Sequence, residues 1–188
     1  FLAVLLVLSL LVLIMLPHAT IVLGMASLLL VALYPKMKRL TWWPQLFLGF
    51  TFNWGALMGW VAVTQHLSSG MLPAYIGGVF WTLGYDTIYA HQDKQDDAAI
   101  GVKSTALLFG DKSKKYVGAF YALSLIFLMY AKFGAPSQSI LTPLLTALAG
   151  AQLVWQLVTW DMNSPESCLK IFISNPAYSL LVLPMLAL

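Results

Sequence analysis

Two long stretches of this sequence carry no charged side chain, and they limit what the chain can fold into. The first runs from Phe1 to Pro35 and the second from Leu40 to Tyr85. A helix that crosses a membrane needs about 20 mostly apolar residues. Over all 188 residues, 60% are hydrophobic and 9% are charged, whereas soluble domains average about 25% charged residues. The sequence therefore predicts a protein that crosses a membrane several times.

Breaks at proline, glycine and charged residues divide the apolar sequence into seven candidate membrane-spanning helices. They cover residues 1–16, 19–35, 44–65, 72–91, 115–131, 138–160 and 172–188. Because lipid offers the backbone no hydrogen-bond partner, the predicted fold class is all-α, a multi-span transmembrane helical bundle. We expect a single domain over residues 1–188. It starts and stops inside apolar runs, so we also expect truncation at both ends.

The basic residues are divided unequally between the two sides of this bundle. When the connections are assigned alternately to the two sides, nine of the ten Lys and Arg residues fall on one side and only Lys132 on the other. Short loops rich in Lys and Arg stay inside. The basic side is therefore predicted to face the cytoplasm or the mitochondrial matrix, from a bacterial or mitochondrial inner membrane. Its two long connections, residues 36–43 and 92–114, can act together.

Four of the seven acidic residues lie in one short segment, YDTIYAHQDKQDD. If the preceding helix continues through it at about 100° per residue, Asp86, Asp93 and Asp97 share one face and Asp96 points elsewhere. Carboxylates this close need a neutralising cation, and Mg²⁺ binds one or two carboxylates together with water and substrate phosphate. The alternative is a solvated loop in which Asp96 and Asp97 cap a helix and Lys94 pairs locally. The spacing alone leaves both interpretations open.

The other basic-side connection, YPKMKRLTWWPQ, carries residues suited to an anionic ligand. Tyr34 and Lys38 are one helical turn apart, and Lys is a point-charge partner for phosphate. Arg39 adds a planar fork that suits a carboxylate, and Lys103 lies in a connection long enough to cover a pocket. The alternative is that the basic residues only hold the loop inside. Asn53, a lone polar residue in an apolar span, either lines the pocket or hydrogen-bonds between helices.

These segments resemble a known family of membrane enzymes. The second aspartate-rich motif of the UbiA superfamily of prenyltransferases is similar to YDTIYAHQDKQDDAAIGVKSTALLFGD. That family's Y-x₃-K segment, with the helix after it, resembles VALYPKMKRLTWWPQLFLGFTFNWGALMGW, and its stretch before the last span resembles CLKIFISNPAYSL. The resemblance covers essentially all 188 residues. It is closest to the members that transfer a polyprenyl group to 4-hydroxybenzoate in ubiquinone biosynthesis.

The resemblance implies nine transmembrane helices around a central cavity, of which about seven are present here. It implies an enzyme that uses Mg²⁺, with polyprenyl diphosphate, 4-hydroxybenzoate and the lipid bilayer as partners and no nucleic acid. The expected metal ligands are Asp93 and Asp97, with Asp86 beside them. These three carboxylates and Lys38 are the expected catalytic residues.

The same resemblance implies a set of substrate-binding residues. They are Tyr34, Lys38, Arg39, Asn53 and Lys103. Tyr34 and Lys38 match the Y-x₃-K pair near the diphosphate. Lys103 and Arg39 fall at basic positions that contact the diphosphate or the aromatic carboxylate.

One part of the family pattern does not occur in these residues. The first aspartate-rich motif, N-D-x-x-D-x-x-x-D, would precede Phe1, so we expect two helices and half of the metal site to lie outside this chain and the piece alone to be inactive. Two other interpretations stay open. One is a prenyltransferase of the superfamily with another acceptor, such as homogentisate, a naphthoate, haem or a lipid. The other is an ion-coupled secondary transporter or cation channel, whose intramembrane carboxylates mark an ion path.

Overall fold

The structure, a computed structural model, describes residues 1–68, 70–133 and 139–187, and within these ranges it contains helices and no strand. In chain order the helices are α1 (Leu2–Ile14), α2 (His18–Leu40), α3 (Pro44–Phe52), α4 (Trp54–Thr64), α5 (Met71–Ala90), α6 (Lys94–Ala99), α7 (Thr105–Phe109), the 3₁₀ turn η1 (Gly110–Lys112), α8 (Ser113–Phe133), α9 (Leu141–Thr159), α10 (Pro165–Ile173) and α11 (Asn175–Ala187). The predicted all-α class is confirmed.

Six of the seven predicted segments coincide with one helix or with two consecutive helices, and segment 44–65 is divided at Asn53 into α3 and α4. The last segment, 172–188, corresponds to α11, whereas most of α10 (Pro165–Ile173) lies in the predicted connection between segments 138–160 and 172–188, so that connection was wrongly left without a helix. Within the described residues, four helical stretches are long and apolar enough to cross a membrane, and α1 is apolar but shorter. The four are His18–Leu40, Pro44–Thr64, Leu141–Thr159 and Pro165–Ala187. These features support a multi-span membrane protein.

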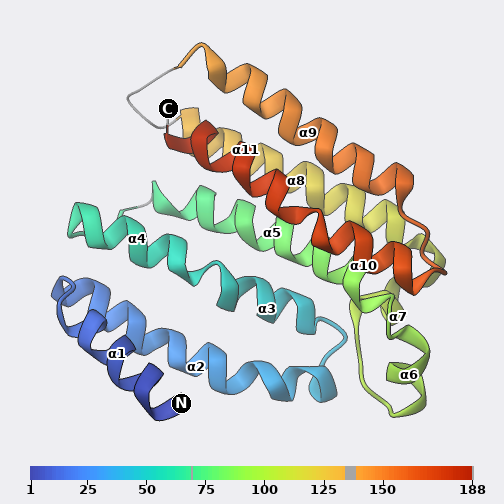
Figure 1. Ribbon diagram of the computed structural model, residues 1–188, viewed down its shortest axis with the longest axis horizontal. Coiled ribbons are helices and arrows are strands. Elements are labelled where there is room, and N and C mark those ends of the chain that lie inside the picture. Colours follow the sequence, from blue (N-terminus) through green and yellow to red (C-terminus); the bar gives the residue numbers. More distant parts are fainter. Residues whose placement is uncertain (69, 134–138, 188) are drawn as a thin grey trace.

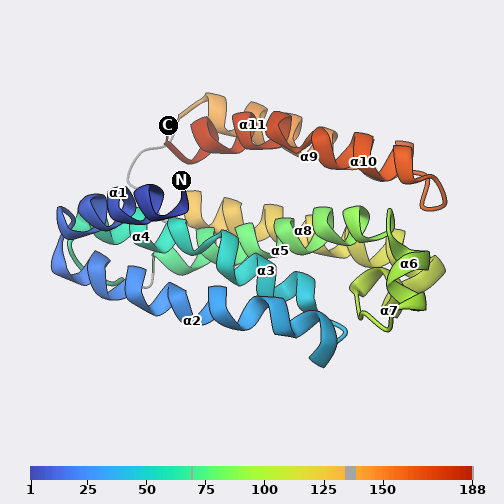
Figure 2. The ribbon, with the colours of Figure 1, turned by 60° about the horizontal axis from the view of Figure 1, so that its bottom comes forward.

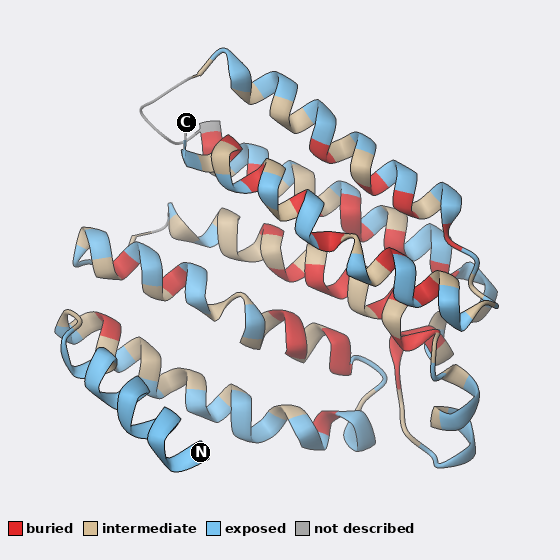
Figure 3. Ribbon diagram, viewed as in Figure 1, coloured by how far each residue is buried: buried red, intermediate tan, exposed pale blue. Residues whose placement is uncertain are grey.

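Helices α5 and α8 form the centre of the bundle. Figure 1 shows α3 and α4 on one side of α5 with α2 beyond them, and α9, α10 and α11 on the other side. Buried residues gather on α5, α8 and the helices around them, whereas α1 has none (Figure 3). The close approach of the two central helices requires Gly84, because a Cβ there would lie 2.4 Å from the ring of Tyr121.

The two basic-side connections lie at the same end of the bundle. Figures 1 and 2 show the end of α2, the start of α3, the end of α5 and the short helices α6 and α7 together there. The prediction that the two connections share one side is thus confirmed. Helix α2, however, continues to Leu40 instead of ending near residue 35. Pro35 does not stop it, and the helix dipole favours Lys38 and Arg39 in its last turn.

Candidate active site

The acid-rich segment is not the continuous helix that its spacing suggested. Helix α5 ends at Ala90, a turn follows, and α6 begins at Lys94. In the turn, the N–H groups of His91 and Gln92 donate to carbonyls three residues back, those of Ile88 and Tyr89. The assumption of one uninterrupted helix was therefore wrong, because the chain tightens to three-residue hydrogen bonds and then restarts.

The three carboxylates nevertheless line one cavity. Its volume is about 100 Å³, and it lies at the basic end of the bundle. Six of the eight residues predicted from sequence line it, drawn from α2, from α5 and from the connection after α5. They are Tyr34, Lys38, Asp86, Asp93, Asp97 and Lys103. The remaining lining residues are Pro44, Gln45, Tyr89, Ala90 and Ser104. Segments far apart in sequence thus bring opposite charges to one space.

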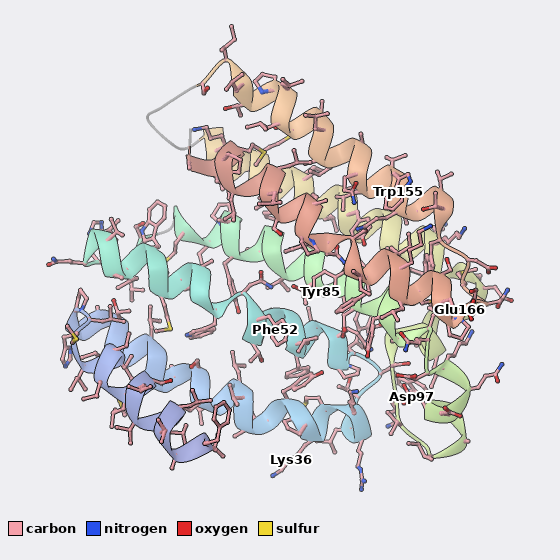
Figure 4. All side chains as sticks on the ribbon, in the orientation of Figure 1. Lys36, Phe52, Tyr85, Asp97, Trp155 and Glu166 are labelled. Atoms are coloured by element: carbon pink, nitrogen blue, oxygen red, sulfur yellow. The ribbon has the colours of Figure 1, made fainter. Side chains whose placement is uncertain are left out.

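The backbone of α6 leaves the carboxylates of Asp93 and Asp97 available to the cavity. Asp93 occupies the N-cap position, yet its side chain accepts no capping hydrogen bond. The N–H of Asp97 donates to the carbonyl of Asp93 across 2.8 Å, which places the two residues one helical turn apart. Asp96, between them, lines a different cavity. In the alternative interpretation Asp96 and Asp97 cap a helix, but the N-cap position of α6 belongs to Asp93, and Asp96 and Asp97 lie within its first turn. Figure 4 labels Asp97 on α6, near the ends of α2 and α5.

Lys38 is the cation that these carboxylates face. Its charge acts on both Asp86 and Asp97. Burial raises the pKa of the Asp97 carboxyl, Lys38 opposes that shift, and the neighbouring Asp93 and Asp96 add to it. Tyr34, one turn before Lys38, also interacts electrostatically with Asp86. Tyr34 and Lys38 of α2 therefore lie beside the acidic segment at one cavity.

Backbone contacts hold the connection after α6 against the end of α2. The N–H of Lys103 donates to the carbonyl of Lys38 across 2.8 Å, and its ammonium donates to the carbonyl of Leu40 across 3.3 Å. The same ammonium lies 5.7 Å from the centre of the Trp42 ring, within cation–π range. The prediction that this connection covers a pocket agrees with these contacts.

A second set of contacts anchors the same connection to α3 and α5. The N–H of Thr105 donates to Oε1 of Gln45 across 3.0 Å, and the hydroxyls of Thr87 and Thr105 lie 2.7 Å apart. Ser104 caps α7 by accepting from the N–H of Leu107. Sequence reasoning missed Gln45. Its signal was a lone polar residue directly after Pro44 at the start of an apolar run.

Two predicted site residues are placed elsewhere. Arg39 is exposed in the last turn of α2 and does not line the cavity. Asn53 donates to the carbonyl of Gly49 across 2.9 Å and to Oγ1 of Thr82 on α5 across 2.8 Å. These contacts support the alternative that was left open for Asn53, a hydrogen bond between helices.

A second, aromatic cavity is lined in part by residues of α5. Its volume is about 330 Å³, and it is lined by Trp81, Tyr85, Phe172, Asn175, Pro176 and Ser179. Tyr85, labelled in Figure 4, lines it, and the next residue, Asp86, lines the charged cavity. The rings of Trp81 and Tyr85 are 5.1 Å apart, and those of Tyr85 and Phe172 are 5.7 Å apart. Consecutive residues of α5 thus line the polar cavity and the aromatic one.

The charged cavity fits a metal ion that is shared with a substrate anion. Within the part of the chain that the structure describes, no three His, Cys, Asp or Glu side chains stand close enough to enclose a metal ion. Mg²⁺ does not need such a cage, because one or two carboxylates suffice when water and phosphate fill the remaining positions. Asp93 and Asp97 can supply those carboxylates, and Lys38 and Lys103 line the same cavity.

Comparisons with known proteins agree with this arrangement. The model of the "UbiA prenyltransferase family" matches residues 1–181. The protein "4-hydroxybenzoate polyprenyltransferase, mitochondrial" of Bos taurus is 51% identical over 185 residues, which cover 94% of this chain and 48% of that protein. Its counterparts in Arabidopsis thaliana and Homo sapiens are 49% and 48% identical, over 97% and 94% of this chain and 45% and 48% of those proteins. The chain spans about half the length of these relatives. No solved structure matches it.

Proposed function

Because the chain belongs to the UbiA prenyltransferase family, we propose that the protein transfers a polyprenyl group from polyprenyl diphosphate to the ring of 4-hydroxybenzoate. The names of its relatives describe this acceptor and this kind of transferred group for those proteins. The observation that carries the proposal is the single cavity lined by three carboxylates, two lysines and Tyr34. Such a mixture suits a diphosphate that is bound together with a divalent cation.

In the proposed reaction, the bond between the allylic carbon and the diphosphate oxygen breaks. A new carbon–carbon bond forms at the ring carbon next to the hydroxyl of 4-hydroxybenzoate, and that carbon loses its proton. The departing diphosphate carries the growing negative charge. Stabilising charge that develops in the transition state is the largest contribution that preorganised groups can make. The site therefore needs positive charge at the diphosphate.

The chain's own residues supply part of that charge. Lys38 and Lys103 line the cavity from two segments that are hydrogen-bonded to each other, so their relative position is held before the substrate arrives. Asp93 and Asp97 would hold Mg²⁺ against the diphosphate, with Asp86 beside them. When bound, Mg²⁺ supplies Lewis-acid stabilisation of the leaving group. Tyr34, which lines the same cavity from α2, would orient a phosphate oxygen.

The aromatic cavity suits the other end of the donor. Trp81, Tyr85 and Phe172 offer apolar surface to an isoprenoid chain, and their ring faces can stabilise a carbon that becomes cation-like. Tyr85 and Asp86 are consecutive, so we place the allylic carbon near this part of α5. A membrane-embedded bundle also allows a long prenyl chain to extend into lipid. We place the protein in a bacterial or mitochondrial inner membrane, with the basic end facing the cytoplasm or the matrix.

The test replaces the metal-binding carboxylates one at a time in the full-length protein. We expect Asp93→Asn and Asp97→Asn each to reduce Mg²⁺-dependent prenyl transfer by about 100-fold or more, the range seen when one stabilising group is removed from a reacting site. Asp96→Asn is the matched control, because Asp96 has the same chemistry in the same helix and lines another cavity. It should stay within about threefold of the unmodified protein. Full activity in both Asp93→Asn and Asp97→Asn would refute the metal assignment.

A further inference from the structure

Gln45 is a buried polar residue on the wall of the charged cavity, and the proposed reaction does not yet use it. It follows Pro44 in the first turn of α3, and its side chain is only 4% exposed. Buried amides need hydrogen-bond partners, because an unsatisfied polar group in an apolar surrounding is costly. How its two polar atoms are used therefore bears on its role.

The contact with Thr105 determines which way the amide of Gln45 faces. A backbone N–H can only donate, so the atom 3.0 Å from the Thr105 nitrogen must be the acceptor, Oε1. The NH₂ group consequently points away from Thr105. Among the described residues it has no hydrogen-bond acceptor, and its nitrogen is not among the fully buried, unsatisfied atoms. Gln45 is one of the residues that line the charged cavity.

We propose that the NH₂ group of Gln45 donates a hydrogen bond to an anionic oxygen of the bound diphosphate, while Oε1 holds the Lys103–Thr105 segment in place. The inference rests on the proposed function, since it names a further binding residue of that site. Lys38, Lys103 and Ser104 line the same cavity. An anion bound there would therefore have two cations and a hydroxyl group nearby in addition to the amide. Gln45 would thus hold the Lys103–Thr105 segment and bind the ligand with the same side chain.

Two substitutions separate this role from that of a tether alone. Gln45→Glu keeps an oxygen that accepts from Thr105 but replaces the donor with a negatively charged acceptor. Gln45→Met keeps the length and loses both functions. If Gln45 binds the anion, affinity for inorganic pyrophosphate in the presence of Mg²⁺ should fall about tenfold in Gln45→Met, the loss expected for one hydrogen bond to a charged group. It should fall at least about 100-fold in Gln45→Glu, because like charges then face each other.

A tether alone predicts the opposite order, with Gln45→Glu close to the unmodified protein and Gln45→Met weakest. Observing that order by calorimetry on the full-length protein would overturn the proposal. An unchanged affinity for pyrophosphate combined with a raised KM for 4-hydroxybenzoate would also overturn it. That pattern would mean that the NH₂ group of Gln45 binds the carboxylate of 4-hydroxybenzoate. Gln95→Glu is the charge-matched control, since Gln95 is exposed on α6 and lies outside this cavity. It should leave pyrophosphate binding within about twofold.

A measurement on the unmodified protein covers the case in which a variant does not fold. In protein labelled with ¹⁵N-glutamine, the side-chain NH₂ resonance of Gln45 should shift on addition of Mg²⁺ and pyrophosphate, and the Gln95 resonance should not. An unmoved Gln45 resonance in a protein that binds pyrophosphate contradicts this inference alone. If the unmodified full-length protein binds no pyrophosphate with Mg²⁺, the proposed function itself fails.

Discussion

The backbone N–H of Lys103 donates to the carbonyl oxygen of Lys38 across 2.8 Å, and the two residues line the same cavity. They are 65 positions apart in sequence. The bond joins the last turn of α2 to the segment that follows the acidic helix α6. The same cavity is lined by Asp86, Asp93 and Asp97.

Replacing Lys38 should slow the transfer step. Lys38→Gln removes the charge that faces Asp86 and Asp97 and the departing diphosphate, so kcat should fall by about 100-fold. Lys36→Gln is the control, because Lys36 is exposed two residues away in the same helix and projects away from the bundle in Figure 4. Steady-state kinetics with both substrates should show no more than a threefold effect for Lys36→Gln. Equal losses in the two variants would mean that only the general basic charge matters.

Metal affinity should weaken at acidic pH. Burial, with Asp93 and Asp96 nearby, raises the pKa of Asp97 against the effect of Lys38. Protons therefore compete with Mg²⁺ at a higher pH than they would at an ordinary aspartate, and the Mg²⁺ concentration for half-maximal activity should rise as the pH falls through that raised pKa. A profile that is unchanged by Asp97→Asn would contradict this assignment.

The same raised pKa has a consequence for stability without metal. A carboxyl whose pKa is raised by folding binds its proton more tightly in the folded state, so its contribution is favourable at low pH and is lost as the pH rises through the folded-state pKa. In EDTA, Asp97→Asn should therefore raise the midpoint of thermal unfolding more at pH 7 than at pH 4. Adding Mg²⁺ at pH 7 should reduce that difference. An equal effect at both pH values would count against it.

A buried polar network should stabilise the helix break between α10 and α11. Gln156 accepts from the hydroxyl of Tyr121 across 2.7 Å and donates to Oγ of Ser174 across 2.9 Å and to Oδ1 of Asn175 across 3.2 Å. Gln156→Leu leaves the buried hydroxyl of Tyr121 without its acceptor and removes one bond each from Ser174 and Asn175, so it should lower the free energy of unfolding by about 1–3 kcal/mol. Gln152→Leu, one turn earlier on α9, loses a single 3.5 Å contact to Ser174 and should cost less than about 1 kcal/mol. Denaturant unfolding in mixed micelles measures the free energy of unfolding of the two variants.

The contact between the two central helices should not tolerate a side chain at Gly84. A Cβ there would lie 2.4 Å from the ring of Tyr121, so Gly84→Ala should destabilise the protein by about 1–3 kcal/mol through overpacking. Gly59→Ala is the control, because a Cβ at Gly59 meets nothing within 4 Å and alanine favours the helix. Unfolding measurements should show no loss of stability for Gly59→Ala.

Much of the candidate site could be predicted because its residues form patterns over short stretches of sequence. The D-x₃-D spacing and the Y-x₃-K pair identified residues that line the cavity. The positions of Asn53 and Arg39 were harder to predict. For a polar residue in a span, such as Asn53, the local sequence does not tell whether the side chain faces a ligand or another helix. For Asn53 the deciding fact is its 2.8 Å contact with Thr82, which is 29 positions away.

The sequence by itself determined that the chain is a helical membrane protein and which end is basic, because apolar length and loop charge are local properties. The spacing of the carboxylates left two interpretations of the acidic segment open. The tertiary structure decided that α5 stops at Ala90, that the acidic segment turns before α6, and that the Lys103 segment docks on Lys38 and Gln45. The physical reason is that the local sequence is compatible with several backbone conformations. Hydrogen bonds and packing between residues tens of positions apart determine which of them is stable.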